Sequence, residues 1–136
     1  MGARHRGRTI AMQALFSWDI NRRPVGDLCD LDWLEPEQRD GEAADFARLL
    51  IAGALEHVED IDTAISDHLE HWTLGRLAKV DLAILRLSAY SLLYQSDVAA
   101  GITINEAITL AKEYGTDDSY RFVNGVLDSI RTTDRP

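Results

Sequence analysis

The chain has 136 residues, 46% of them hydrophobic and 27% charged, as in an ordinary globular domain with a real core. Its one cysteine, Cys29, excludes an internal disulfide and fits a reducing cytoplasm. The formal net charge is −9, yet residues 1–23 hold five arginines against a single acid, so the rest of the chain carries −13. A basic segment on an acidic body favours an anionic partner, most often nucleic acid, and the alternative is a solvated tail.

The first predicted helix starts between Arg4 and Arg8 and runs to about Arg22, where Pro24 ends it. Its core face follows the helical repeat at Ala11, Ala14, Leu15 and Trp18. Phe16 lies off this face, two turns beyond Arg8. Arginines followed by such an aromatic are suited to hold phosphates and stack a base. Packing of Phe16 beneath the next connection explains the position equally well.

An acidic stretch follows at 24–45, and it is most simply a solvated face with a short helix at 25–34. A long helix is predicted over 42–71 from apolar residues that recur every three or four positions. Gly53 lies inside this helix and Gly125 inside the last one, where glycine destabilises a helix. We therefore expect close helix packing at both glycines.

The stretch 77–95 is apolar nearly all round, which predicts a helix buried on most sides at the centre of the domain. It is too short and carries too many charges to span a membrane. Asp81 and Arg86 lie within the apolar pattern, where a charge needs a partner. A neighbouring helix is the simpler partner for each, and a binding partner of the protein is the alternative.

Two further helices complete the chain. Thr103 and Glu106 form a T-x-x-E capping box, which predicts the start of a helix that runs from about 104 to 114. Asp118 offers an N-cap oxygen to a last helix at about 119–131. No alternating strand pattern occurs anywhere, so the sequence predicts a compact all-α bundle of about six to seven helices.

Motifs of catalysis and cofactor binding are lacking. No glycine-rich phosphate loop, nucleophile motif or dinucleotide fingerprint occurs, so neither an enzyme nor a cofactor is expected. His68 and His71 share an HxxH spacing, but two histidines with no third ligand are a weak metal signal, and no metal site is predicted. The residues alone indicate a helical binding module for an anionic partner.

Three stretches resemble the NusB family of bacterial transcription antitermination factors: RxxAMQALFSWD, LxKVDLAILRLSAYSLLY and INEAITLAKEYGTDDSYRFVNGVLD. The resemblance covers nearly the whole chain except the acidic stretch 24–45. It implies two small helical subdomains within one RNA-binding domain, residues 1–136, with a basic N-terminal arm at about 1–8. It also implies a cytoplasmic protein that binds boxA RNA together with NusE, a ribosomal protein. The pair would help assemble the antitermination complex on RNA polymerase at ribosomal RNA operons.

The resemblance also assigns residues. The family's arginine-rich N-terminal segment meets RNA, and Arg4, Arg6 and Arg8 match it. His5 stands where relatives often have another arginine, which would weaken the grip on phosphate. Phe16 matches an aromatic position beside that segment.

A second group of residues belongs to the family's GxxDSxxFVNG stretch, which is also implicated in RNA contact. Here it supplies Asp118, Arg121 and Phe122. Asp118 is ambiguous, since an N-cap role and a hydrogen bond to a base amino group are equally compatible with its position. Asp81 is the acid that the resemblance favours as a contact for NusE.

Three alternatives stay open. The same domain forms the N-terminus of certain ribosomal RNA cytosine methyltransferases, and a cofactor domain would then follow if the chain were a fragment. A second alternative is a helical protein-interaction adaptor whose arginines only solubilise it. A homodimer that hides the arginine face is also possible, because Phe16 lies off the core face beside the arginines.

Overall fold

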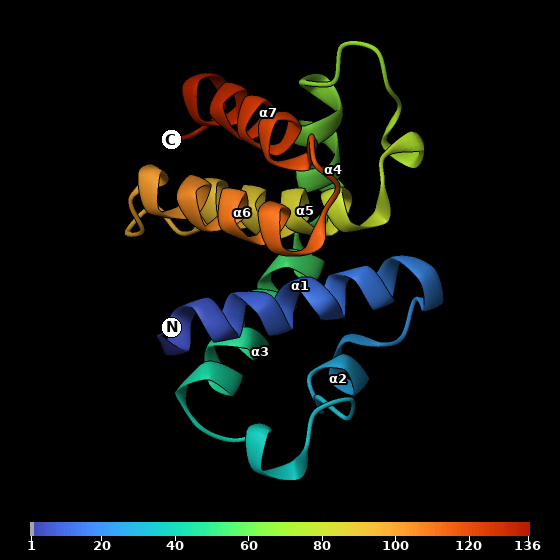
Figure 1. Cartoon of the computed structure of the whole chain (residues 1–136), viewed down its shortest axis with the longest axis vertical. Coiled ribbons are helices and arrows are strands. Elements are labelled where there is room, and N and C mark those ends of the chain that lie inside the picture. The colour runs from blue at the N-terminus through green and yellow to red at the C-terminus, as the bar shows by residue number, and fades with distance from the viewer. Residues whose placement is uncertain (1) are drawn as a thin grey trace.

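The computed structural model describes residues 2–136, and every regular element among them is a helix (Figure 1). This confirms the predicted all-α class and the count of about seven helices, to which two short 3-10 helices are added. The elements are α1 (Ala3–Asn21), α2 (Val25–Leu28), η1 (Pro36–Gln38), α3 (Glu42–Glu56), α4 (Val58–Asp67), η2 (Leu74–Arg76), α5 (Lys79–Tyr94), α6 (Ala100–Tyr114) and α7 (Ser119–Thr133).

The helices form two groups along the long axis of the molecule. Helices α1, α2 and α3 make one group, and α4 to α7 make the other (Figure 1). Helix α5 lies between them and contacts α1, α3, α4, α6 and α7. Every residue from Asp81 to Ala89 is buried, as the apolar pattern predicts. Two helical subdomains therefore share one continuous core, which α5 joins.

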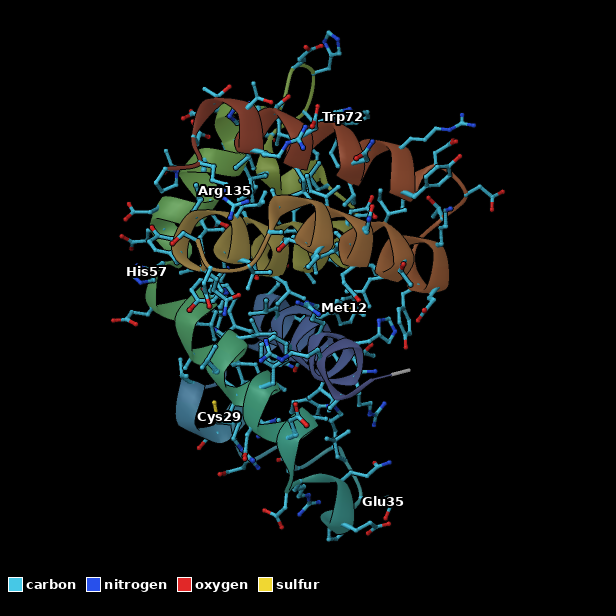
Figure 2. The ribbon with its side chains drawn as sticks, turned by 90° about the vertical axis from the view of Figure 1, so that its left-hand side faces the viewer. Met12, Cys29, Glu35, His57, Trp72 and Arg135 are labelled. Carbon is cyan, nitrogen blue, oxygen red and sulfur yellow. The ribbon has the colours of Figure 1, made fainter. Side chains whose placement is uncertain are left out.

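The predicted long helix over 42–71 is wrong. The chain bends at His57, so α3 and α4 are separate helices, and α4 already ends at Asp67. The His57 ring stacks on the Tyr94 ring of α5, with centroids 4.0 Å apart. Figure 2 labels His57 at the junction of α3 and α4. Because of the bend, α3 packs on α1 while α4 packs on α5. The apolar faces of α3 and α4 are therefore buried in different groups of helices. The apolar repeat continues across the bend and gives no sign of it.

The two interior glycines behave differently. A Cβ at Gly53 would lie 2.2 Å from Cζ of Tyr90, so α3 and α5 approach closely there, as predicted. A Cβ at Gly125 would meet nothing within 4 Å. The expected packing contact at Gly125 is therefore wrong, because this side of α7 faces open space.

The predicted capping box is also wrong. Helix α6 begins at Ala100, one turn earlier than expected, so Thr103 lies inside it. The Thr103 hydroxyl is buried without a hydrogen-bond partner, and the Glu106 carboxylate binds His5 of α1 instead. The short helix predicted at 25–34 shrinks to α2, since the backbone turns left-handed at Leu31.

Arg86 has the internal partners that its burial demands. Its guanidinium donates to Asp62 of α4 at 2.9 and 3.0 Å and to Asp19 of α1 at 2.8 Å. Burial alone would raise the pKa of Asp19, but hydrogen bonds from Lys79 and Arg86 outweigh it and hold that pKa below its ordinary value. This buried network ties α1, α4 and α5 together. The charge of Arg86 is therefore paired by neighbouring helices and not by a binding partner of the protein.

Across residues 2–136, no helix combines the length and the apolar character that a membrane span needs.

Candidate nucleic-acid interface

The N-terminal arginines belong to a helix rather than to a separate arm. Helix α1 is already formed at Ala3, so the predicted arm at about 1–8 is helical from Ala3 onward; Gly2 is the extended N-cap, and Met1 lies outside the described residues. Arg4 and Arg6 are exposed. The Arg4 guanidinium lies 4.5 Å from the centre of the Phe46 ring, while Arg6 projects into solvent without an ion pair. The helix thus presents these two cations on a rigid support.

His5 and Arg8 turn inward instead. Nδ1 of His5 lies 2.8 Å from Glu106 and Nε2 lies 3.5 Å from Glu113, both on α6. Arg8 is 8% exposed, and its guanidinium lies 3.9 Å from Glu106 and 5.3 Å from the centre of the Phe46 ring. Burial lowers the pKa of Arg8, against the opposing effect of Glu106. These two predicted RNA contacts are thus already engaged with α6 carboxylates.

Phe16 is half-buried on the outer side of α1. It lines one hollow of about 330 Å³ with Asp81 and with Gly115, Thr116 and Ser119 of the α6–α7 connection. It lines a second, more apolar hollow with Val80 and Tyr114. Phe16 therefore reaches the α6–α7 connection rather than packing under the segment that follows α1.

The α6–α7 connection places Asp118 at the N-cap of α7, yet the Asp118 side chain makes no capping hydrogen bond. The hydroxyl of Ser119 accepts from the Thr116 backbone N–H at 2.9 Å instead. The exposed Asp118 carboxylate is therefore free for other partners. The predicted capping role is not seen.

Arg121 and Phe122 lie in the first turns of α7 and face different surroundings. Arg121 is exposed, and its Nε donates to the Tyr120 hydroxyl at 2.9 Å. Phe122 is half-buried in a hollow of about 260 Å³ that Trp72 and Asp81 also line. Figure 2 shows Trp72 beside α7 at one end of the long axis.

The predicted residues form two clusters rather than one. Arg4, His5, Arg6 and Arg8 gather at the start of α1, beside the middle of α6. Phe16, Asp81, Asp118, Arg121 and Phe122 gather around the α6–α7 connection and the start of α5. Helix α6 runs alongside α1 and joins the two clusters (Figure 1).

Asp81 differs from Arg86 in having no internal partner for one oxygen. The residue is 9% exposed, and its Oδ1 is buried without a hydrogen bond. The two hollows that it lines open on either side of the first turn of α5. A buried carboxylate oxygen without a donor is costly, so a cationic or N–H-bearing ligand in these hollows would be favoured.

Three residues of this surface were missed from the sequence. Glu106 was assigned to a cap, Phe46 to the core, and Lys112 was not singled out. The Nζ of Lys112 lies 5.0 Å from the centre of the Tyr120 ring, which brings a cation to the α6–α7 connection. Packing of α6 against α1 and α7 reveals the roles of Glu106 and Lys112, and packing of α3 against α1 brings Phe46 to Arg4. No local sequence pattern shows these contacts.

Metal binding has no support among residues 2–136, where no three His, Cys, Asp or Glu side chains gather as a metal site. His68 caps the end of α4 and pairs with Asp134 at 2.8 Å. His71 lies in the following loop and is exposed. The HxxH spacing therefore does not place both rings on one helix face.

Comparison with known proteins identifies the class to which this helical fold belongs. The family model described as the NusB family matches residues 5–132, so the chain belongs to the NusB family. The transcription antitermination protein NusB of Treponema pallidum (strain Nichols) is 50% identical over 131 residues, which cover 93% of this chain and 91% of the relative. That of Geobacter sulfurreducens is 46% identical, covering 98% and 96%.

Solved structures agree with this assignment. A structure of T. maritima NusB matches with a TM-score of 0.87 at 42% identity, covering 98% of this chain and 93% of the other. A crystal structure described as antitermination factors NusB and NusE in complex with double-stranded RNA matches with a TM-score of 0.85 at 29% identity, covering 97% and 98%. The resemblance drawn from the three sequence stretches is confirmed.

Proposed function

We propose that this protein is a transcription antitermination factor. It binds single-stranded boxA RNA together with the ribosomal protein NusE and helps assemble the antitermination complex on RNA polymerase at ribosomal RNA operons. The observation that carries the proposal is the match over nearly the whole chain to proteins named transcription antitermination protein NusB, at up to 50% identity. The likeness to the solved assembly of NusB, NusE and RNA supports both partners.

The RNA surface that we propose has a phosphate-binding end and a base-reading end. Arg4 and Arg6 are exposed cations on a rigid helix and would hold phosphates. Asp118 and Arg121 are free at the other end to bind a base amino group and a phosphate. Arg8 would act chiefly by offsetting the charge of Glu106 on α6, and the His5 ring would hold the same carboxylate in place.

The aromatic members of the proposed surface are Phe16 and Phe122. Each is half-buried and lines a hollow at the start of α5. Half-buried rings at the wall of a hollow suit an unstacked base, and single-stranded RNA supplies such bases.

The protein partner would dock at the first turn of α5. The unpaired Oδ1 of Asp81 and the exposed Trp72 offer a buried negative charge beside an aromatic wall. The unpaired Oδ1 would accept from a lysine or arginine of a basic ribosomal protein, in the hollow that Arg76 and Phe122 also line.

The proposal assigns the chain to the bacterial cytoplasm as a single domain, without catalysis and without a cofactor. The relatives' name is that of a transcription protein rather than an enzyme, and this chain spans 91 to 96% of their length. That likeness favours the antitermination factor over the methyltransferase domain. The adaptor alternative differs from the proposal only in lacking RNA binding, which an experiment can decide.

The test compares binding of a fluorescent, boxA-like single-stranded RNA to the wild-type protein and to the double variant Arg4→Ala/Arg6→Ala. Loss of two phosphate contacts should reduce the log–log salt slope by about 1.4 and lower the affinity roughly tenfold at moderate salt. The control, Arg22→Ala/Arg131→Ala, removes the same charge from exposed sites elsewhere and should bind like the wild type. Equal RNA binding by wild type and Arg4→Ala/Arg6→Ala would remove these two arginines from the RNA surface, and no RNA binding by the wild type would favour the adaptor.

A further inference from the structure

The cations of this acidic protein are mostly occupied. Within residues 2–136, most lysine and arginine side chains meet a carboxylate or a backbone carbonyl, as Arg39 does in the acidic stretch and Arg48 does just after it. The side chains that meet neither are those of Arg4, Arg6, Arg76, Lys112 and Arg121. An anionic ligand gains most from such cations, because it displaces no internal partner.

Two of these free cations share one aromatic ring. Lys112 lies in the last turn of α6, and its Nζ is 5.0 Å from the centre of the Tyr120 ring. The Arg121 guanidinium is 5.4 Å from the same centre, and its Nε donates to the Tyr120 hydroxyl at 2.9 Å. Tyr120 is half-buried in the first turn of α7, so it fixes both cations at the α6–α7 connection.

We infer that Lys112 and Arg121, held together by Tyr120, form a second phosphate-binding site for the RNA backbone. The inference rests on the proposed RNA-binding function and adds Lys112 as a contact and Tyr120 as a positioning residue. A planar guanidinium beside a mobile ammonium suits a phosphate, whose oxygens accept from both. The site reads no base, so it would contribute equally to any single-stranded RNA.

The proposed site is continuous with the arginines of α1. Glu113 follows Lys112 in the sequence, and its carboxylate lies 3.5 Å from the His5 ring. Glu106, about two turns earlier on α6, pairs with the same ring at 2.8 Å. The Arg8 guanidinium also lies 3.9 Å from Glu106, so its charge makes the path across α6 from Arg6 to Lys112 less repulsive to phosphate than the sequence of α6 suggests.

A nucleic acid fits this cluster better than a basic protein does. Two free cations repel a lysine- or arginine-rich surface, whereas the carboxylate of Asp81 attracts one. The Tyr120 side of the α6–α7 region therefore suits RNA phosphates, whereas the Asp81 carboxylate suits a cationic group.

The experiment measures binding of a fluorescent boxA-like RNA and of a scrambled RNA of equal length, each across a salt series. The proteins are wild type, Lys112→Ala, Tyr120→Leu and the control Arg131→Ala. Arg131 is an exposed cation on the same helix as Arg121, and its partner is Asp128. Lys112→Ala should weaken binding of both RNAs by the same factor, roughly three- to tenfold, and reduce the salt slope by about 0.7. Tyr120→Leu should weaken both RNAs to a smaller extent.

The outcomes separate this inference from the function on which it rests. If the wild type binds RNA and Lys112→Ala keeps its salt slope, the second phosphate site is wrong while the proposed function stands. A loss confined to the boxA-like RNA would also contradict a phosphate contact. If the wild type binds neither RNA at low salt, the proposed function itself fails. Thermal melts of each variant show whether a loss of binding comes from unfolding.

Discussion

Asp81 and Arg86 lie five residues apart on the buried helix α5, and they differ in whether other residues of the protein bind them. Arg86 is fully engaged by Asp19 and Asp62, whereas one oxygen of Asp81 is buried with no donor. The sequence predicts that both need partners but cannot say which partner is internal, because Asp19 and Asp62 are distant in the chain. At the residue scale, the unsatisfied oxygen is the reason for proposing Asp81 as a contact for the ribosomal partner.

Replacing Asp81 by Asn should weaken binding of the ribosomal partner without unfolding the protein. Loss of a charge-assisted hydrogen bond costs about 1.5–3 kcal/mol, which is roughly a tenfold to hundredfold loss of affinity. Calorimetric titration with the purified partner measures it, and Asp40→Asn, an exposed acid in the acidic stretch, is the control. Wild-type affinity in Asp81→Asn would remove Asp81 from the interface.

Replacing Arg86 by Met should destabilise the fold, because Asp19 and Asp62 would lose their guanidinium partner in a partly buried network. Breaking such a pair costs about 3–5 kcal/mol, measured by urea unfolding at pH 7. The pKa of Asp19 is held low in the fold, so its pairing stabilises above the ordinary pKa of about 4 and is lost as pH falls further. The stability difference between wild type and variant should therefore shrink below about pH 4. A difference that stays constant down to pH 2 would show that Asp19 contributes little.

At the scale of elements, the sequence predicts the helices well and their ends less well. The buried helix α5, the stop at Gly115 and the last helix agree with the structure. The bend at His57 escapes prediction, because the apolar repeat runs through it and the reason for it is tertiary. The start of α6 is missed because Thr103 and Glu106 match a capping box, while the real use of Glu106 is to bind α1.

Gly53 and Gly125 form a matched pair for testing helix packing. Gly53→Ala would push a Cβ into the Tyr90 ring and should destabilise by about 1–3 kcal/mol. Gly125→Ala has open space and a better helix former, so it should stabilise by about 0.5–1 kcal/mol. Urea or thermal unfolding of both variants measures the contrast. Equal effects of the two substitutions would contradict the packing described for α3 on α5.

At the scale of the whole molecule, the acidic stretch 24–45 keeps its acids exposed, Glu35 among them. Arg39 within this stretch and Arg48 just after it donate to backbone carbonyls of the stretch. Glu35 and Trp72 lie toward opposite ends of the molecule in Figure 2. On the proposed function, RNA would be repelled from this acidic surface and drawn to the free cations of α1, α6 and α7.

A homodimer that covers the outer face of α1 stays a prediction. Phe16 and Tyr114 line an apolar hollow on that face, beside the exposed arginines. Such a dimer would compete with RNA, so the apparent mass should fall to that of a monomer as RNA is added. Light scattering over a concentration series tests this expectation. A monomer at the highest concentration, with no RNA present, would rule it out.

The site was predictable in part. The arginine-rich start follows from the sequence and its resemblance, whereas for Asp118 they leave an N-cap role and an RNA contact equally open. The inward turn of His5 and Arg8 depends on α6, which lies 100 residues away in the chain. No local pattern could show it, because the contact exists only once α1 and α6 pack together.

The most direct test of the central claim is binding of a short boxA-like single-stranded RNA across a salt series, with and without the ribosomal partner. About three to five phosphate contacts predict a log–log slope of roughly −2 to −3.5. We expect this slope together with tighter binding when the partner is present. No binding at low salt with the partner present would contradict it and leave a helical adaptor.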